Sequence, residues 1–288
     1  MNNVRELLAH ARVRLARQSE EPALDSEVLL AHALGCDRSW LYAWPEHVPE
    51  GDRLERFEYL VLQRQQGRPV AHLVGEREFW SLQLKVNHDT LIPRPETEHL
   101  VEIALGLKLS DNARVLDLGT GSGALALALS SERPGWRITA LDRSQAALKV
   151  ARENASSLDL GGVSFLHSDW FEALPPVAHY DLILSNPPYV AEQDPHLARG
   201  DLRFEPPQAL VSGADGLDDI RRITAAAAGF LRPGGWLWLE HGAEQGKRVT
   251  ELLRNSGFVA VTVERDLAGH ERHSGGRLPV ERTVTTSG

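Results

Sequence analysis

Three things are scarce in this sequence: cysteine, net positive charge and long apolar runs. With one cysteine, Cys36, among 288 residues, no intramolecular disulfide can form and no cysteine-based zinc site is expected. A net charge of −9 and a pI of about 5.7 argue against broad electrostatic binding of nucleic acid. No apolar run is long enough for a membrane span, and residues 1–6 lack the apolar core of a signal peptide. We therefore expect a cytoplasmic protein that contacts no membrane and binds no nucleic acid directly.

Histidine is present, but it is scattered. Of the twelve histidines, His270 and His273 lie close together near the end of the chain, without further ligands beside them. We interpret both as surface residues and expect no metal site. The remaining composition, 42% hydrophobic and 25% charged, is typical of a globular protein.

The hydrophobic pattern changes twice along the chain, which predicts three parts. Residues 1–75 show helical periodicity only, and they are either a bundle that packs on the main domain or a platform that recognises a macromolecular substrate. Residues 76–90 alternate with a period of two, which predicts a β-hairpin linker around Trp80-Ser81. Residues 91–288 alternate strands and helices, which predicts an α/β domain with a mostly parallel sheet covered by helices.

Two local expectations can be checked directly. Asp25 is a plausible N-cap for a helix that ends at Leu34, before Gly35. At the other end of the chain, two final strands are expected over residues 259–264 and 278–285.

The most informative stretch is Ser185-Asn186-Pro187-Pro188-Tyr189, which follows an apolar run typical of a buried strand. Open α/β sheets bind ligands at the carboxyl ends of their strands. Because prolines have a fixed φ and no N–H, this loop is stiff, rich in carbonyl oxygens and poor in donors. Such a loop suits a substrate with an NH2 group, and Tyr189 offers a ring for a flat one.

A second motif, the glycine-rich run over residues 119–123, follows the first strand of the main domain. Glycines allow a sharp turn and a close approach of a ligand, and the next helix begins with free N–H groups. Asp142, at the end of the second strand, can accept both hydroxyls of a ribose. Because Gly119-x-Gly121-x-x-Ala124 also fits a dinucleotide-binding fingerprint, these residues alone favour hydride transfer and methyl transfer equally.

Two further residues shift the balance toward methyl transfer. Asp169 and Trp170 are predicted at the end of the third strand, where Asp169 can accept the exocyclic amine of an adenine and Trp170 can stack on it. The acceptor-rich loop at Asn186 has no role in moving a hydride. Three alternating glycines also suit the amino-acid tail of a cofactor.

Residues 117–123, together with Asp142, resemble the S-adenosylmethionine site of class I methyltransferases. The Asn-Pro-Pro-Tyr run at residues 186–189 resembles the signature of those that methylate planar NH2 groups of adenine or glutamine. Further segments, residues 91–98, 168–171, 192–197, 203–206 and 239–242, are similar to the PrmC/HemK protein-glutamine methyltransferases, over nearly the whole chain. One departure is that residues 277–280 lack the Gly-Arg-Tyr-type strand expected there.

The resemblance implies a methyl transfer from S-adenosylmethionine, with S-adenosylhomocysteine as product, to the Gly-Gly-Gln glutamine of class 1 peptide chain release factors. It implies a set of cofactor contacts at Gly119, Thr120, Gly121, Ser122, Gly123, Asp142, Trp170 and Asn186. The substrate contacts it implies are Asn186, Pro187, Pro188 and Tyr189. We expect Asn186 and the Pro187 carbonyl to hold the amide N–H bonds while Tyr189 stacks on the amide, without a strong base.

Three alternatives remain open at this point. The same loop fits an adenine-N6 methyltransferase acting on nucleic acid, although the acidic charge balance disfavours it. A second alternative with the same fold is a methyltransferase for a glutamine of a ribosomal protein. A release-factor-binding module without activity is disfavoured, because such a module needs no cofactor site.

Overall fold

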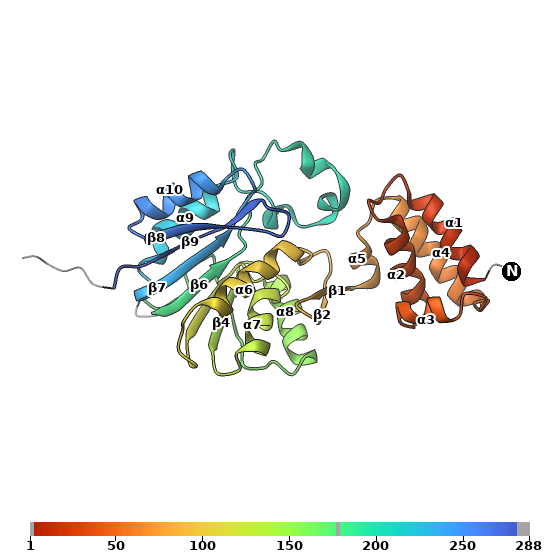
Figure 1. The fold of residues 1–288 in the computed structure, drawn as a ribbon, viewed down its shortest axis with the longest axis horizontal. Coiled ribbons are helices and arrows are strands. Elements are labelled where there is room, and N and C mark those ends of the chain that lie inside the picture. Colours follow the sequence, from red (N-terminus) through yellow and green to blue (C-terminus); the bar gives the residue numbers. More distant parts are fainter. Residues whose placement is uncertain (1–2, 177–178, 281–288) are drawn as a thin grey trace, which may run out of the picture. The chain divides into compact units, whose positions relative to one another are not determined.

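The computed structural model describes residues 3–176 and 179–280, which divide into two compact units. The helical unit comprises Met1–Glu76 together with Pro195–Phe204, and the sheet unit comprises Arg77–Asp194 and Glu205–Gly288. In Figure 1 the helices of the first segment of the helical unit are the red and orange part of the chain.

The helical unit is built on amphipathic helices that bury one apolar face each. The buried residues Val4, Leu7, Ala11 and Leu15 form the inner face of the first helix and pack against Phe57, Leu60 and Val61. Among the described residues, none of the helices has the combination of length and apolar character that a bilayer span requires. The helices of this unit are α1 (Val4–Leu15), α2 (Pro22–Leu34), α3 (Arg38–Ala43), α4 (Gly51–Gln65) and α5 (Val70–Val74).

A buried arginine joins the two chain segments of the helical unit. The Arg64 Nε donates to Asp25 Oδ2 over 2.8 Å, and its Nη1 donates to Asp201 Oδ1 over 2.7 Å. The prediction that Asp25 caps α2 is therefore wrong, because the helix begins one turn earlier, at Pro22. Proline is favoured at a first helical position since it needs no partner for an N–H, so Asp25 is free to bind Arg64.

The sheet unit contains a seven-stranded sheet in the order β5-β4-β3-β6-β7-β9-β8 (Figure 1). β3 to β7 are parallel, and β9 is antiparallel to both β7 and β8. This arrangement confirms the predicted α/β class with a mostly parallel sheet. The strands are β3 (Arg114–Leu118), β4 (Arg137–Asp142), β5 (Ser164–His167), β6 (Tyr180–Ser185), β7 (Leu231–Glu240), β8 (Val259–Arg265) and β9 (Glu271–Arg277).

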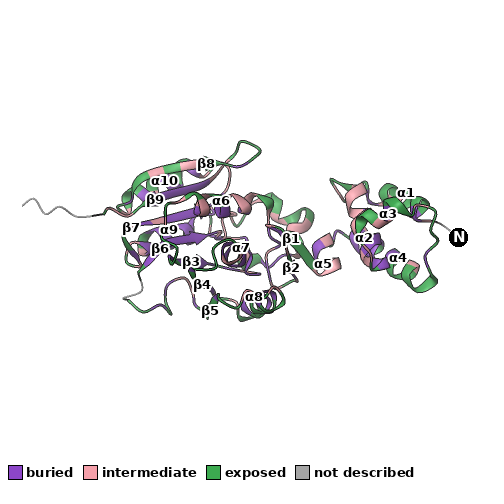
Figure 2. Cartoon of the chain, turned by 60° about the horizontal axis from the view of Figure 1, so that its bottom comes forward, coloured by how far each residue is buried: buried purple, intermediate pink, exposed green. Residues whose placement is uncertain are grey.

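Alternating residues of the central strands build two hydrophobic cores, one on each face of the sheet. On β3, Val115 belongs to the core under α6, α7 and α8, whereas Leu116 belongs to the core under α9 and α10. The strands between these layers are buried along most of their length (Figure 2). The helices are α6 (Glu98–Gly106), α7 (Ala124–Glu132), α8 (Gln145–Ser157), α9 (Asp218–Ala227) and α10 (Gly246–Asn255).

The predicted hairpin is present as β1 (Glu76–Phe79) and β2 (Leu82–Lys85). Its turn residues Trp80 and Ser81 both have positive φ, as a two-residue hairpin turn of this kind requires. The fully buried Asn154 of α8 holds the hairpin, because its amide exchanges two hydrogen bonds with the Lys85 backbone and donates a third to Ser122 O. The hairpin is thereby fixed to the glycine-rich turn.

The end of the chain differs from the sequence prediction. The last described strand is β9 (Glu271–Arg277), whereas residues 278–280 are not a strand and residues 281–285 lie outside the described residues. His273, expected at the surface, is fully buried in this strand, although the side chain of His270 is 58% exposed. This strand was not predicted because position 275 is a glycine and gives no apolar signal: a Cβ there would lie 2.2 Å from the Trp238 ring.

Candidate functional site

The candidate site lies where the sheet changes its direction of growth. From β3 the chain continues outward to β4 and β5, and it then returns to the other side of β3 with β6. The carboxyl ends of these strands diverge at such a point and leave a crevice. The predicted site residues Gly119, Asp142, Asp169 and Asn186 each follow or end one of these strands.

A pocket at these strand ends brings seven of the predicted site residues together. They are Gly119, Gly121, Asp142, Asp169, Trp170, Asn186 and Pro188. The other predicted residues are not part of its lining: Thr120, Ser122, Gly123 and Pro187 are buried, and Tyr189 is partly buried beside them.

The glycine-rich turn directs most of its N–H groups into the protein. The Gly119 and Thr120 N–H groups donate to Leu141 O over 2.9 and 2.8 Å, and Gly123 N–H donates to Thr120 O. Gly121, with a φ of 56°, has no atom within 4 Å of the place where a Cβ would lie. The turn therefore contributes open space along its backbone more than it contributes donors.

Asp142 fixes this turn from the end of β4. Its Oδ2 accepts from Gly121 N–H over 2.9 Å, and its Oδ1 accepts from Ser144 N–H over 2.7 Å. Burial raises the pKa of the Asp142 carboxyl, which these backbone hydrogen bonds partly oppose. Since each carboxylate oxygen has a second lone pair, the group can still accept from a ligand in the pocket.

Asp117, at the penultimate position of β3, is more strongly perturbed. Burial raises the pKa of its carboxyl to about 7, against a hydrogen bond from Thr120 Oγ1 to Oδ2 over 2.6 Å. Its Oδ1 is buried and has no hydrogen-bond partner among the described residues. The carboxylate form of Asp117 is therefore costly in the folded protein.

Asp169 and Trp170 follow β5 and face the pocket together. The Asp169 Oδ2 accepts from Arg222 Nη2 over 3.0 Å, whereas its Oδ1 is buried and has no partner among the described residues. The Trp170 indole N–H donates to Asp219 Oδ1 over 3.1 Å, which fixes the ring. This ring packs over Gly119, so an oxygen without a partner among the described residues and an aromatic ring held in place belong to neighbouring residues of the pocket lining.

Asn186 presents the second free acceptor of the pocket. Its Nδ2 donates to Thr97 Oγ1 over 3.0 Å, and its Oδ1 is buried without a partner among the described residues. The Tyr189 hydroxyl donates to Glu240 Oε1 over 3.2 Å. Burial, assisted by the Glu240 charge, raises the pKa of Tyr189, so this hydroxyl stays a donor.

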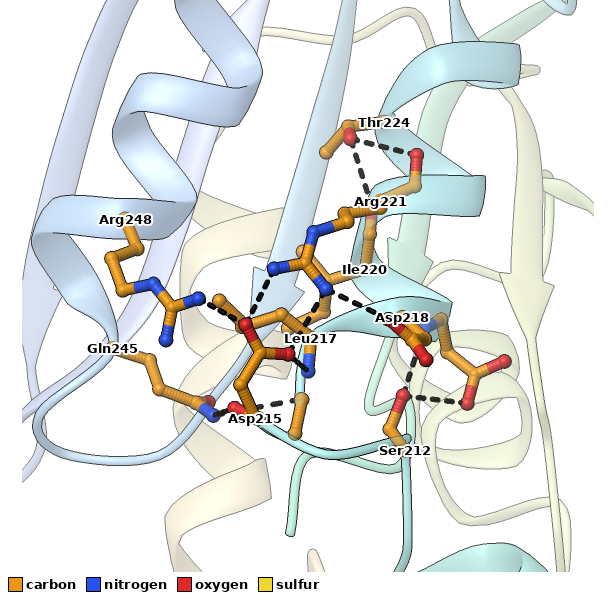
Figure 3. A network of polar contacts seen from close by, with 11 residues as sticks. Ser212, Asp215, Leu217, Asp218, Ile220, Arg221, Thr224, Gln245 and Arg248 are labelled. Atoms are coloured by element: carbon orange, nitrogen blue, oxygen red, sulfur yellow. Dashed lines mark hydrogen bonds and ion pairs between the residues drawn. The ribbon is translucent and has the colours of Figure 1, made fainter. Parts of the chain in front are cut away.

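A polar network around Asp215 joins α9 and α10 (Figure 3), and Gln245 connects it to Tyr189 at the end of this loop. The Gln245 Nε2 donates to Tyr189 O over 3.0 Å and lies near the carbonyl of Asp215. The Asp215 carboxylate accepts from Arg221 and Arg248, and these guanidiniums, Arg221 above all, lower the pKa of Asp215. Through Gln245 and Asp215 the network connects the loop to two helices.

Several pocket residues were not predicted from the sequence. Asp89, Thr90 and Leu91 line the pocket from the segment after the hairpin, and Arg143 and Gln208 line it from two loops. The Arg143 guanidinium donates to Gln208 O over 2.6 Å, which connects the loops. Neither loop carries a motif, and only the position of Arg143 directly after Asp142 gave a signal.

Comparison with known proteins is consistent along the chain. A family model for the PrmC N-terminal domain matches residues 6–75, and one for the methyltransferase small domain matches residues 98–202. The release factor glutamine methyltransferase of Shewanella oneidensis is 49% identical over 275 residues, which cover 95% of this chain and 96% of the relative. That of Xylella fastidiosa is 52% identical over 257 residues, which cover 89% and 93%.

Among solved structures, a methyltransferase from Pyrococcus furiosus has a similar fold. It matches with a TM-score of 0.53 and 16% identity, over 77% of this chain and 98% of that one. At this identity the match speaks for the fold alone. On the strength of its curated relatives, the chain belongs to the family of release factor glutamine methyltransferases.

Proposed function

We propose that this protein methylates the side-chain amide nitrogen (N5) of the glutamine in the Gly-Gly-Gln motif of class 1 peptide chain release factors. The methyl donor is S-adenosylmethionine, and the reaction takes place in the cytoplasm. The observation that carries this proposal is the Asn186 Oδ1, a buried carbonyl oxygen of a pocket-lining residue that has no partner among the described residues. A buried acceptor without a partner is costly, and an amide NH2 is a group that would satisfy it.

The lining of the pocket fits the proposed cofactor. Asp142 suits the ribose hydroxyls, and the free Oδ1 of Asp169 suits an exocyclic amine beside the Trp170 ring. The open backbone at Gly121 suits an amino-acid tail. When bound, S-adenosylmethionine supplies a methyl group on a positively charged sulfur.

The chain's own residues then have to prepare a poor nucleophile, because the lone pair of a carboxamide nitrogen is delocalised. In our proposal the Asn186 Oδ1 and the Pro187 carbonyl accept the two N–H bonds of the substrate amide. These two contacts turn the nitrogen toward the methyl group and stabilise the positive charge that develops on it. Tyr189 packs its ring on the plane of the amide.

The proposed mechanism needs no strong base in the pocket. The Tyr189 hydroxyl donates to Glu240, and the raised pKa of Tyr189 keeps it protonated at neutral pH. The C–S bond breaks as the N–CH3 bond forms, and the nitrogen, which then carries the positive charge, releases one proton to water. Orientation and electrostatics therefore supply the rate enhancement.

For the parts of the chain we propose separate tasks. Residues 1–75 recognise the release factor, residues 76–90 form the linker, and residues 91–288 form the methyltransferase domain. The match of residues 6–75 to the PrmC N-terminal domain supports a dedicated role for the helices. Removal of residues 1–75 is therefore expected to weaken binding of the release factor and to leave cofactor binding in place.

Labelled methyl transfer decides the class of substrate. Purified release factor, total ribosomal protein and nucleic acid are each incubated with the enzyme and tritiated S-adenosylmethionine. We expect label in the release factor, and none in a matched release factor whose Gly-Gly-Gln glutamine is replaced by alanine. Label that appears in nucleic acid or ribosomal protein instead would contradict the proposal.

A further inference from the structure

Three consecutive hydrogen bonds lead from the pocket residue Asn186 to residues that do not line the pocket. The Asn186 Nδ2 donates to Thr97 Oγ1 over 3.0 Å, and Thr97 Oγ1 donates to Glu240 Oε2 over 2.7 Å. The other carboxylate oxygen, Glu240 Oε1, accepts from the Tyr189 hydroxyl. Thr97 and Glu240 are 5% and 1% exposed, and neither lines the pocket.

These residues come from elements that are distant in the sequence. Thr97 ends a 3-10 turn (Pro95–Thr97) that leads into α6, and Glu240 is the last residue of β7. β7 is the neighbour of β6 in the sheet, with Ser185 opposite Leu239. The register therefore places Glu240 level with Asn186, at the carboxyl ends of adjacent parallel strands.

Which group donates and which accepts in each of these hydrogen bonds follows from the number of protons that each group has. A carboxylate can only accept, so the single hydroxyl proton of Thr97 is used toward Glu240. The Thr97 oxygen can then only accept from Asn186, and the donor of a carboxamide is its NH2 group. The amide of Asn186 is thereby held with its nitrogen toward Thr97 and its oxygen directed away, where that oxygen has no partner among the described residues.

We propose that Thr97 and Glu240 are positioning residues, which set the Asn186 amide so that its oxygen faces the substrate NH2. This inference rests on the proposed function, since it assigns how the acceptor of that reaction is oriented. Without the hydrogen bonds to Thr97 and Glu240, the Asn186 amide could turn by 180° about its Cβ–Cγ bond. The Asn186 NH2 group would then face the NH2 group of the substrate amide, and the substrate nitrogen would lose one of its two acceptors.

The Glu240 carboxylate is well suited to hold both ends of the loop. Its described hydrogen bonds come from the hydroxyls of Thr97 and Tyr189. The fully buried His273 approaches it with Nε2 at 3.8 Å, which is beyond hydrogen-bond reach. One carboxylate therefore fixes the first and the last residue of the Asn-Pro-Pro-Tyr loop.

The test compares Thr97→Val with Thr97→Ser. Valine keeps the volume and removes the hydroxyl, whereas serine keeps the hydroxyl. With release factor as substrate, we expect the valine variant to lose roughly tenfold in kcat, the equivalent of about one hydrogen bond. The affinity for S-adenosylmethionine, measured by calorimetry, should be unchanged in both variants, and the serine variant should turn over like the wild type.

Two results would overturn the inference. One is a valine variant that turns over as fast as the serine variant. The other is a valine variant whose loss of kcat is matched by an equal loss of cofactor affinity, because that result indicates a structural role. If the wild-type enzyme does not methylate the release factor at all, it is the proposed function that fails.

A second measurement needs neither substrate nor turnover, and it stands if the valine variant does not fold. In the wild-type protein, the side-chain NH2 of Asn186 should be protected from hydrogen exchange by NMR, and this protection should persist in Thr97→Ser. Exchange as fast as that of an exposed asparagine in the wild type would overturn the orientation that we assign.

Discussion

Asp142 and Asn186 hold corresponding places in the sheet, and the protein treats them in opposite ways. Both come at the carboxyl ends of parallel strands that flank β3, and both line the pocket. Each carboxylate oxygen of Asp142 already accepts a backbone N–H. The Asn186 oxygen accepts from none of the described residues, although it is buried.

The difference teaches how a site divides binding from chemistry. The orientation of Asp142 is fixed through the same atoms that would contact a ligand, so its site is stable without one. Asn186 is fixed through its nitrogen alone, by Thr97, which keeps its oxygen for a transient partner. A group that acts in the transition state must be oriented in advance. A hydrogen bond to the side-chain nitrogen orients the Asn186 amide without using the oxygen that acts on the substrate.

Among the substitutions that test this comparison, replacement of Asn186 by alanine is expected to have the largest effect. Loss of a group that stabilises developing charge costs about 3–4 kcal/mol, so turnover at saturating cofactor should fall roughly a hundred- to a thousandfold. Initial rates of methyl transfer to the release factor measure it. Turnover within a few-fold of the wild type would show that Asn186 does not have this role.

Asp117 extends the comparison, because its Oδ1 also has no hydrogen-bond partner among the described residues, but Asp117 does not line the pocket. With its folded pKa of about 7 above the ordinary value of 3.8, the folded state binds a proton that the unfolded state has lost. The stability that this proton contributes is present near pH 4 and is lost as pH rises to about 7.

Asp117→Asn removes this titration. Relative to the variant, the wild type should lose on the order of 3 kcal/mol of unfolding free energy between pH 4.5 and pH 8, measured by urea unfolding. Asp111→Asn, at an exposed position, serves as a control. A constant difference between wild type and Asp117→Asn across this range would contradict the shifted pKa.

Asp142→Ala tests the binding side of the comparison. The substitution removes charge-assisted hydrogen bonds of about 1.5–3 kcal/mol each and also releases the Gly121 N–H. We expect the cofactor affinity to fall by roughly ten- to a hundredfold in calorimetry. The cofactor affinity of Asp142→Asn, which keeps one acceptor oxygen, should lie between those of the wild type and Asp142→Ala. An unchanged affinity would reject the ribose assignment.

The smallest effect is expected at Asp169, which has one oxygen free for a ligand and the other on Arg222. Asp169→Ala should weaken cofactor binding by roughly tenfold, since it removes one charge-assisted hydrogen bond, worth about 1.5–3 kcal/mol, and releases no backbone N–H. Glu172→Ala is the matched control, because Glu172 also pairs with Arg222 but does not line the pocket. Equal effects of the two changes would assign the loss to Arg222.

Much of the fold could be predicted from the sequence, because the parallel strands are short apolar runs and the helices between them have a clear hydrophobic periodicity. β6 and the hairpin turn at Trp80 appear where the pattern predicts them. The last strand was missed because β9 has the sequence Glu-Arg-His-Ser-Gly-Gly-Arg, which has little β propensity. Packing against Trp238 requires the glycine at position 275, and packing against Phe258 leaves little room for a side chain at Gly276. Such tertiary constraints leave no trace in a hydrophobic pattern.

The residues of the site that belong to sequence motifs could be predicted, but the residues that hold them in position could not. Gly119, Asp142, Asp169 and Asn186 were identified because each ends or follows a predicted strand. Thr97 and Glu240 lie 89 and 51 residues from their partners in the loop. A hydrogen bond at such a separation depends on strand register and on the connector before α6. Neither can be derived from spacing.

The most direct measurement locates the methyl group within the product. Release factor methylated by the wild-type enzyme is digested, and the Gly-Gly-Gln peptide is fragmented in a mass spectrometer. If two carbonyl oxygens hold the two N–H bonds of one amide, the glutamine side-chain nitrogen should carry one methyl group and no second, because a methylated amide offers a single N–H. A methyl group on any other residue, or two on this nitrogen, would contradict the account.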